Sequence, residues 1–395
     1  MALTSRFIAL TAGRWRSFTD TIFFTARRGL RLAPVRAKQL PCLSSLSKKL
    51  QASRRAHLLE HLELMTHTLS RRTFAAAATA CGIFCMTPAM KLFAAPAQKT
   101  ITVATLNERS LAASVDVPLN PQRIAVADMA SLDILDHWGL TERIVAMTQT
   151  TPVPYLAKYF KKTPRVANIG TLKELDLEGL MASEPDIIFI SGRLAKKYKE
   201  LSRIAPVVYL STDRSIGTLK SFEANLMNFA KIFNRSEDAR RDIMGFSTRL
   251  AAIREAARGK TALVGLVTSA HVNLLGNAAR CSLIGNEFGF VNVASEANAN
   301  HGNESSFELL VKLDPDYFFV LDRDSAIARP GAKLAQDILN NDLVNRMKAK
   351  KEGRIAYLTP AAWYLAEGGV SAMDIMFSDV EKALGIAAAS PARPS

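Results

Sequence analysis

Two arginines stand at matching positions in two copies of one sequence pattern. The copies span residues 176–193 and 307–323, and they align on a Pro-Asp pair. Each copy predicts a short amphipathic helix, a turn, a buried strand and an arginine, Arg193 or Arg323, at the carboxyl end of the strand. Ligands of open α/β sheets bind at that end of the strands. The two guanidinium groups are therefore expected to face one cleft between two similar lobes, an arrangement suited to capturing an anion.

Few other side chains could bind a ligand or a metal ion. Arg280 precedes an expected helix and is a third candidate for the anion site. His301 lies in a polar loop directly before the second copy, where no core would hold it, and is a candidate ligand residue. Tyr364 follows an expected strand and precedes two glycines, and the pattern by itself favours aromatic core packing. His137, inside an apolar helix, is interpreted as structural, and His271, after an expected strand, is also more simply structural although it could line the cleft.

Motifs of the common enzyme classes are missing from the sequence. It contains no nucleophile elbow, phosphate-binding loop, HExxH zinc motif or Gly-rich dinucleotide fingerprint. Outside the first 97 residues the only cysteine is Cys281, so neither an internal disulfide nor a thiolate zinc cluster is expected there. These features favour a binding protein that is not an enzyme and needs no cofactor. A metal-dependent hydrolase using His301 and Glu304 is the rival interpretation from another functional class.

The order of elements predicts an α/β fold with two lobes of mainly parallel sheet, joined by a long backbone helix, with the ligand in the cleft between them. A hairpin is expected over 98–118, and apolar residues at helical spacing fill 218–258. Because a helical connector is stiffer than a loop, no large hinge closure is expected. Further strands are predicted at 124–127, 144–147, 207–210, 262–267 and 355–358, and helices at 129–138, 194–204, 283–288, 333–350 and 371–384.

The chain is divided into six segments on this interpretation. They are an upstream or disordered extension (1–64), a signal peptide (65–97), an N-terminal lobe (98–217), a connecting helical segment (218–259), a C-terminal lobe (260–386) and a disordered tail (387–395). Residues 1–97 hold 15 Lys and Arg against 3 Asp and Glu, which leaves about +3 of the net charge of +15 for the rest. The body of the protein therefore gives no support for nucleic-acid binding.

The signal peptide is of the twin-arginine type. Arg71 and Arg72 precede a short apolar run, and Ala95-Pro96-Ala97 supplies small residues for cleavage. Because twin arginines usually lie near the N-terminus, Met65 is the expected start, and a mitochondrial presequence is the rival interpretation of 1–64. A weak lipoprotein-like site suggests a lipid anchor at Cys81 as an alternative outcome of processing.

The body resembles a known family over nearly all of 99–386. It is similar to periplasmic receptors for ferric siderophores of the catecholate, enterobactin-type branch, which serve ABC importers and belong to the helical-backbone metal receptor superfamily. The resemblance is carried by five motifs: Ile190-Ser-Gly-Arg193, Asn300-His-Gly-Asn303, Pro315-Asp-Tyr-Phe-Phe-Val-Leu-Asp-Arg323, Gln336-Asp-Ile-Leu-Asn-Asn-Asp342 and Tyr357-Leu-Thr-Pro-Ala-Ala-Trp-Tyr-Leu-Ala366. One departure is Thr359-Pro-Ala361 before the Trp-Tyr pair, where relatives often carry Asp-Pro-Glu.

The resemblance assigns roles to particular residues. It implies that Arg193, Arg280 and Arg323 surround the catecholate, while His301 and Tyr364 complete the Fe(III) shell when a siderophore offers only four donors. It also implies that Glu178 and Glu308, at matching positions in the two copies, dock on arginines of the two permease subunits.

The expected protein is accordingly a periplasmic, exported monomer that captures a ferric siderophore and delivers it to an ABC permease in the inner membrane. A haem receptor or a manganese or zinc receptor of the same fold is the alternative within this architecture. The arginine set argues against cobalamin and free divalent metal, which require more His and carboxylate ligands.

Overall fold

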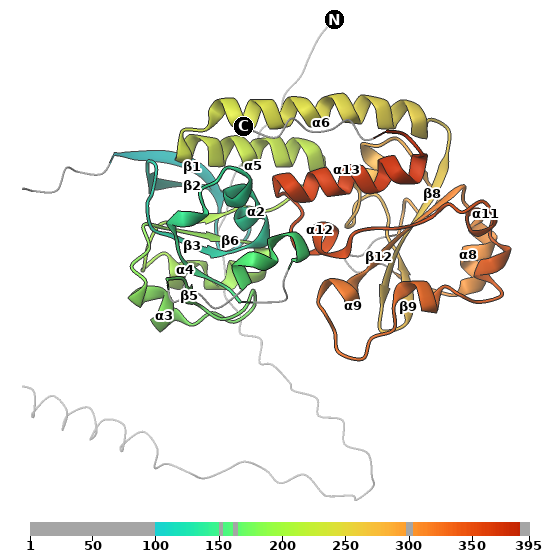
Figure 1. Cartoon of the computed structure of the whole chain (residues 1–395), viewed down its shortest axis with the longest axis horizontal. Helices are drawn as coiled ribbons and strands as arrows, with labels where there is room; N and C mark the ends of the chain where they lie inside the picture. Colours follow the sequence, from blue (N-terminus) through green and yellow to red (C-terminus); the bar gives the residue numbers. More distant parts are fainter. Residues whose placement is uncertain (1–98, 150–152, 161–164, 298–302, 388–395) are drawn as a thin grey trace, which may run out of the picture. The chain divides into compact units, whose positions relative to one another are not determined.

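The computed structural model describes residues 99–149, 153–160, 165–297 and 303–387, all within one compact unit, Leu92–Ser395. Figure 1 shows two β/α lobes in this unit, with long helices running along one side of both. The predicted extension and signal peptide, and nearly all of the predicted tail, lie outside the described residues. In the described part of the chain, every helix is too short or too polar to cross a bilayer.

The N-terminal lobe is built on a parallel five-stranded sheet in the order β5-β4-β3-β6-β7. The central strands β3 and β6 are buried along their whole length, because helices and loops cover both faces, as a parallel sheet requires. The expected hairpin is present as the antiparallel pair β1–β2. The strands are β1 (Thr100–Leu106), β2 (Ala112–Pro118), β3 (Ile124–Ala127), β4 (Ile144–Met147), β5 (Ala167–Asn168), β6 (Ile187–Ile190) and β7 (Val207–Tyr209).

The C-terminal lobe has a mixed sheet in the order β11-β9-β8-β12-β13, with β10 paired to the start of β8. Strands β8, β12 and β13 run parallel, whereas β9 and β11 add an antiparallel edge that the sequence analysis did not predict. His271 follows β8, as expected, and is the exposed first residue of β9. The strands are β8 (Thr261–Thr268), β9 (His271–Leu274), β10 (Val291–Asn292), β11 (Asn303–Ser305), β12 (Tyr317–Asp322) and β13 (Ile355–Tyr357).

The repeated pattern forms the same local structure in both lobes, as predicted. Helix α3 (Leu177–Ala182) leads into β6, and α8 (Phe307–Leu313) leads into β12. The aspartate of each Pro-Asp pair fixes the start of the neighbouring strand: Asp186 Oδ2 accepts from the backbone N–H of Arg123 at 2.9 Å, and Asp316 Oδ2 accepts from that of Thr261 at 2.9 Å. The pair therefore recurs because it holds two parallel strands in register.

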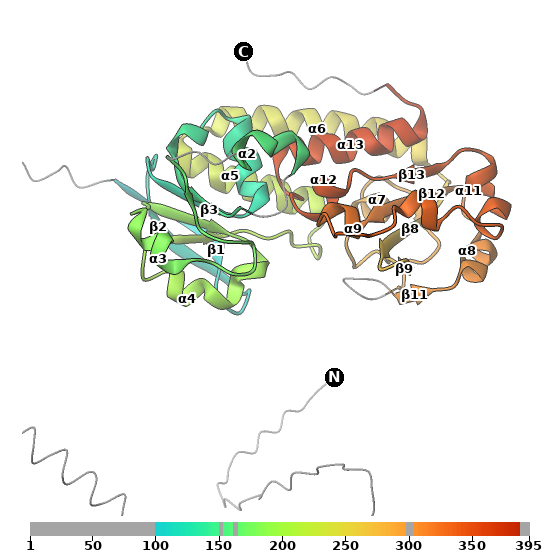
Figure 2. The same cartoon turned by 60° about the horizontal axis from the view of Figure 1, so that its bottom comes forward.

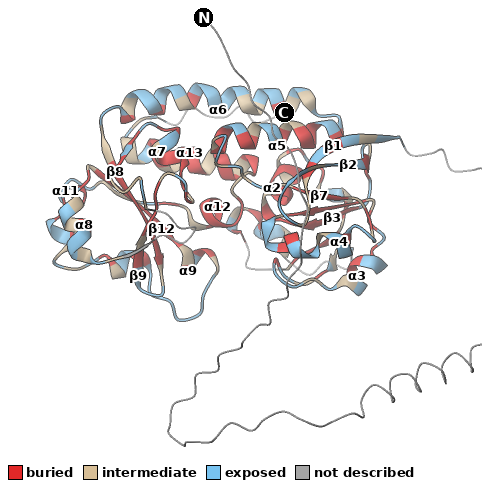
Figure 3. Ribbon diagram, turned by 180° about the vertical axis from the view of Figure 1, so that it is seen from behind, coloured by how far each residue is buried: buried red, intermediate tan, exposed pale blue. Residues whose placement is uncertain are grey.

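Three long helices link the lobes. The predicted helical connector consists of two helices, α5 (Thr218–Phe233) and α6 (Ser236–Ala257), separated by Asn234 in the left-handed conformation. Figures 1 and 2 show α6 and the last helix, α13 (Val370–Leu384), running beside both sheets. Figure 3 shows that the central strands β3 and β12 are buried and that the outer face of α6 is exposed.

The remaining helices are short. The single helix predicted over 333–350 was wrong: that stretch holds three separate turns, because Asn341 accepts backbone hydrogen bonds from Leu343 and Val344 and so replaces helical pairing. The elements are α2 (Met129–His137), η1 (Thr141–Arg143), η2 (Pro154–Phe160), η3 (Gly192–Lys197), α4 (Tyr198–Leu201), α7 (Leu283–Asn286), α9 (Arg323–Ala326), α10 (Ala335–Ile338), η4 (Val344–Arg346), α11 (Lys348–Lys351) and α12 (Pro360–Tyr364).

A buried carboxylate joins the N-terminal lobe to α13. Asp133, on α2, accepts from the backbone N–H groups of Ser371 at 2.7 Å and Ala372 at 2.9 Å, and from the Tyr155 hydroxyl at 2.9 Å. Gly369 permits this approach, because a Cβ there would lie 2.5 Å from the Asp133 side chain. Burial is the main reason that the pKa of Asp133 is raised to about 6. The hydrogen bonds from the first N–H groups of α13 act in the opposite direction, because they favour the charged form of the carboxylate.

A second buried group ties α13 to α6. The guanidinium of Arg249 is 3% exposed and forms a forked pair with Glu381, at 2.7 and 2.8 Å. The forked geometry fixes the two long helices against each other and compensates the buried charge. On α2, His137 contacts Asp242 of α6 at 3.0 Å, which agrees with the structural role expected for it.

Candidate functional site

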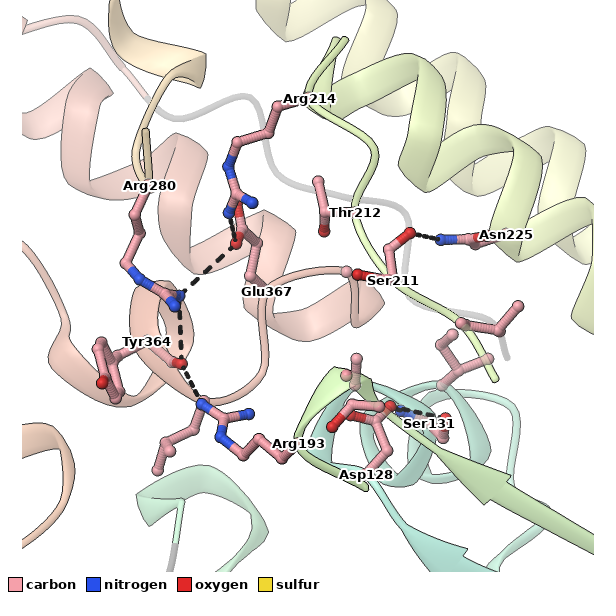
Figure 4. A pocket seen from close by; sticks show the side chains of 17 residues that line it. Asp128, Ser131, Arg193, Ser211, Thr212, Arg214, Asn225, Arg280, Tyr364 and Glu367 are labelled. Carbon is pink, nitrogen blue, oxygen red and sulfur yellow. Dashed lines mark hydrogen bonds and ion pairs between the residues drawn. The ribbon is translucent and has the colours of Figure 1, made fainter. Parts of the chain in front are cut away.

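A pocket of about 460 Å³ lies where loops following the strands of both lobes meet. From the N-terminal lobe it receives the segments after β3, β6 and β7, and from the C-terminal lobe the segment before α7 and the end of α12. This is the carboxyl-end position predicted for the cleft. Figure 4 shows its side chains, and the lining residues that carry charge are Asp128, Arg193, Arg214, Arg280 and Glu367.

Tyr364 is the residue around which the predicted arginines gather. The residue is 8% exposed, and the guanidinium carbons of Arg280, Arg323 and Arg193 lie 4.5, 5.7 and 5.9 Å from the ring centroid. These distances lie within the range of cation–π attraction. The structure thus brings together four predicted site residues that are far apart in sequence, and Tyr364 is both buried aromatic and part of the pocket wall.

Hydrogen bonds hold each guanidinium to the tyrosine or to its backbone. Arg193 Nη2 donates to the Tyr364 carbonyl at 3.2 Å, and Arg280 Nη1 donates to the same oxygen at 3.4 Å. Arg323 Nε donates to the Tyr364 hydroxyl at 2.9 Å, and its Nη1 donates to Thr268 Oγ1 at 3.1 Å. Arg323 therefore stands behind Tyr364 and is not among the residues that line the pocket.

The position of Tyr364 is set by α12. Pro360 opens this helix at a position where the missing N–H costs no hydrogen bond. Asp379 of α13 accepts from the Thr359 backbone N–H at 2.7 Å and from Trp363 Nε1 at 2.9 Å. The Thr-Pro-Ala variant of the loop thus keeps α12 fixed against α13.

The pocket holds a cluster of cations, of which Arg193 is exposed and Arg214 and Arg280 are half-buried. Burial lowers the pKa of Arg193, and the nearby charge of Arg280 lowers it further, whereas Asp128 raises it. Asp128 caps α2 by accepting from the backbone N–H of Ser131 at 2.9 Å, yet burial raises its pKa above the usual value. An anion placed before Arg193 and Arg280 would relieve the repulsion between these two cations.

Three of the five charged pocket residues, Asp128, Arg214 and Glu367, were not predicted from the sequence. Arg214 lies in the loop after β7, and Glu367 lies three residues after Tyr364. Arg214 Nη2 donates to the Glu367 carboxylate, which also lies 3.8 Å from Arg280 Nη1. The strand-end rule that identified Arg193 applies equally to Arg214 and could have found it.

The other predicted site residues lie apart from the pocket or outside the described residues. His301 belongs to the second group, and so does the side chain of Glu304. Glu178 and Glu308 occupy the first turns of α3 and α8 and are both exposed. In the part of the chain that the structure describes, no group of three or more His, Cys, Asp or Glu side chains could hold a metal ion.

Together, two β/α lobes, stiff connecting helices and a cationic pocket between them define a two-lobed ligand-binding protein. The chain belongs to the periplasmic binding protein family, whose model matches residues 124–362. It is 32% identical over 271 residues to the petrobactin-binding protein YclQ of Bacillus subtilis, covering 68% of this chain and 84% of that protein. It is 26% identical to the ferric-anguibactin-binding protein FatB of Vibrio anguillarum, and the match covers 66% of this chain and 82% of FatB.

Solved structures of similar proteins confirm the two-lobed α/β fold. The match with the crystal structure of YclQ covers 73% of this chain and 99% of the YclQ chain, with a TM-score of 0.68. The periplasmic catecholate-siderophore binding protein VctP of Vibrio cholerae is 28% identical. The match covers 71% of this chain and 100% of the VctP chain, with a TM-score of 0.66.

Proposed function

We propose that this protein captures a ferric catecholate siderophore and delivers it to an ABC-type importer in the inner membrane, as a step of iron uptake, and that it catalyses no reaction. The observation that carries the proposal is the cluster of Arg193, Arg280 and Arg323 around Tyr364 at a pocket between two lobes. The names of YclQ, FatB and VctP, which refer to petrobactin, ferric anguibactin and catecholate siderophores, support it.

The chemistry of the cluster suits this ligand. Fe(III) held by catecholate oxygens is a large complex with diffuse negative charge. Arginine stays protonated even when buried, offers forked donors and stacks on planar groups, so it fits such a complex better than lysine does. The pocket volume of about 460 Å³ falls in the usual range for small-molecule sites.

Tyr364 and His301 are proposed to ligate the iron of a siderophore that leaves two coordination positions open. Phenolate and imidazole are both established ligands of iron in proteins. The hydrogen bond from Arg323 Nε fixes the orientation of the Tyr364 hydroxyl, which supports a defined role for its oxygen.

Docking to the importer is proposed to use Glu178 and Glu308. They lie on equivalent helices of the two lobes, and both carboxylates are exposed. Paired charges on separate lobes would set the register of the protein on two permease subunits.

Delivery outside the cytoplasm is proposed to use twin-arginine export from a start at Met65. The mature protein would be a periplasmic monomer, with lipidation of Cys81 as the alternative to cleavage after Ala97. Replacing Arg71 and Arg72 by Lys should leave the precursor in the cytoplasm, which fractionation and immunoblotting would detect.

Fluorescence titration tests the ligand assignment. Trp363 adjoins Tyr364, so a ferric catecholate in the pocket should quench tryptophan emission in a saturable way. Parallel titrations with haem, Mn²⁺ and Zn²⁺ should give no saturable change. Saturation by haem or by a divalent metal, with none by ferric catecholate, would overturn the proposal in favour of the other receptors of this fold.

A further inference from the structure

An ion pair between the lobes places a carboxylate inside the proposed anion site. Glu367 comes from the segment that joins α12 to α13, and its side chain is 9% exposed. It accepts from Nη2 of Arg214, which comes from the loop after β7 in the other lobe, and lies 3.8 Å from Arg280 Nη1. Figure 4 shows the carboxylate between the two guanidinium groups.

This carboxylate has no evident place in a pocket built only for attraction. Asp128, the other acidic lining residue, caps α2. The contacts of Glu367, by contrast, run to pocket arginines, and it cancels positive charge that an anionic ligand would use. Within the described residues, the Nε atoms of Arg214 and Arg280 are buried without a hydrogen-bond partner. Removal of the Glu367 charge would leave these two guanidinium groups with still fewer partners and would free the Nη groups that it contacts for a compact anion.

We propose that Glu367 is a specificity-determining residue that acts as a built-in counter-ion, occupying the Arg214–Arg280 pair so that small free anions such as phosphate and citrate do not bind there. This inference rests on the proposed function. A phosphate or a carboxylate binds by a fork to one or two guanidinium groups, and so competes directly with Glu367 for the same donors. A ferric catecholate is larger and can contact Arg193 and the Tyr364 side of the pocket without displacing it.

The test measures small-anion affinity in matched variants of the full chain. Calorimetric titration with inorganic phosphate and with citrate should show at least about tenfold tighter binding to Glu367→Gln than to the parent, because one uncompensated cation is exposed at close range. The gain should exceed any change in affinity for ferric catecholate. Glu200→Gln removes an equal charge from an exposed site on α4, outside the pocket, and should produce no gain.

A double variant separates charge compensation from simple support of the arginines. Arg214→Gln with Glu367→Gln restores the pocket charge and removes one guanidinium, so its phosphate affinity should return to within about threefold of the parent. If Glu367 only held Arg280 in place, the double variant would resemble the single one. Thermal unfolding of each variant establishes that it is folded. If the single variant does not fold, the phosphate affinity of the double variant still tests the inference.

Two results would overturn the inference: unchanged phosphate and citrate affinity in Glu367→Gln, or a loss of ferric catecholate binding with no gain for the small anions. The outcome is distinct from failure of the proposed function. If the parent did not bind ferric catecholate at all, the proposed function would fall, while the phosphate titrations would still show whether Glu367 excludes small anions.

Discussion

Removal of the Arg193 side chain should weaken ferric catecholate binding more than removal of the Arg323 side chain. Arg193 lines the pocket directly, whereas Arg323 reaches it only through the Tyr364 hydroxyl. Arg193 is exposed to the pocket, although partial burial of its guanidinium lowers its pKa, and its Nη2 bond to the Tyr364 carbonyl is 3.2 Å long. It can therefore form a charge-assisted hydrogen bond with an anion that enters the pocket.

The size of the effect follows from the strength of such bonds. Hydrogen bonds to charged groups contribute about 1.5–3 kcal/mol, so Arg193→Ala should raise the Kd for a ferric catecholate by about 10- to 150-fold. Arg323→Ala should fall at or below the lower end of this range, because its loss acts through the position of Tyr364. A neutral ferric hydroxamate complex should lose less affinity with either change, since the charge term is missing.

The assay is tryptophan fluorescence titration of the parent and variants with both complexes. Arg193→Lys keeps the charge without the forked donors and should give an intermediate Kd. Arg203→Ala removes an exposed arginine outside the pocket and serves as the matched control. Equal losses for catecholate and hydroxamate, or a loss below about threefold for Arg193→Ala, would refute the reasoning, because neither fits a charge-assisted contact.

Three further changes test other parts of the account. Tyr364→Phe should remove a charge-transfer band from the visible spectrum of a tetradentate ferric catecholate complex and matter little for a hexadentate one; an unchanged spectrum would make Tyr364 a packing residue only. Glu178→Ala with Glu308→Ala should abolish iron uptake by cells while leaving ligand affinity intact, and normal uptake would refute the docking role. Asp133 has a pKa that is raised from 3.8 to about 6, so the folded state binds its proton more tightly than the unfolded state does. Proton binding to Asp133 therefore stabilises the fold fully below pH 3.8, and this stabilisation is lost as the pH rises through about 6. Between pH 7 and pH 5 the parent should therefore gain about 1 kcal/mol in unfolding free energy relative to Asp133→Asn, measured by urea unfolding, and a constant difference would contradict the assignment.

Much of the fold could be predicted because its signals are local. Apolar runs flanked by Pro-Asp turns indicated the buried strands β6 and β12, and Asp186 and Asp316 recur because each caps a neighbouring strand. The helix expected over 333–350 was wrong because its apolar spacing is also compatible with short turns packed on a sheet. The antiparallel strand that begins at His271 was missed because four residues of alternating burial give a weak pattern.

The site was predictable only in part, for a different reason. Arg193 and Arg323 stand out through their matched positions in the repeat. Arg280 was a candidate from its place before a helix, and the resemblance to siderophore receptors assigned a binding role to it and to Tyr364. The importance of Glu367 cannot be read from its neighbours, because it arises from a contact with Arg214 across two lobes and 153 residues of sequence. Such contacts depend on the tertiary structure and leave no periodic signal in the chain.

The most direct test of the central claim is an anomalous diffraction map, recorded at the iron absorption edge, from crystals of the protein grown with a ferric catecholate. The account predicts one iron peak per chain within the pocket, facing Tyr364 and flanked by the guanidinium groups of Arg193 and Arg280. An iron peak elsewhere on the protein, or an empty pocket at saturating ligand, would contradict it.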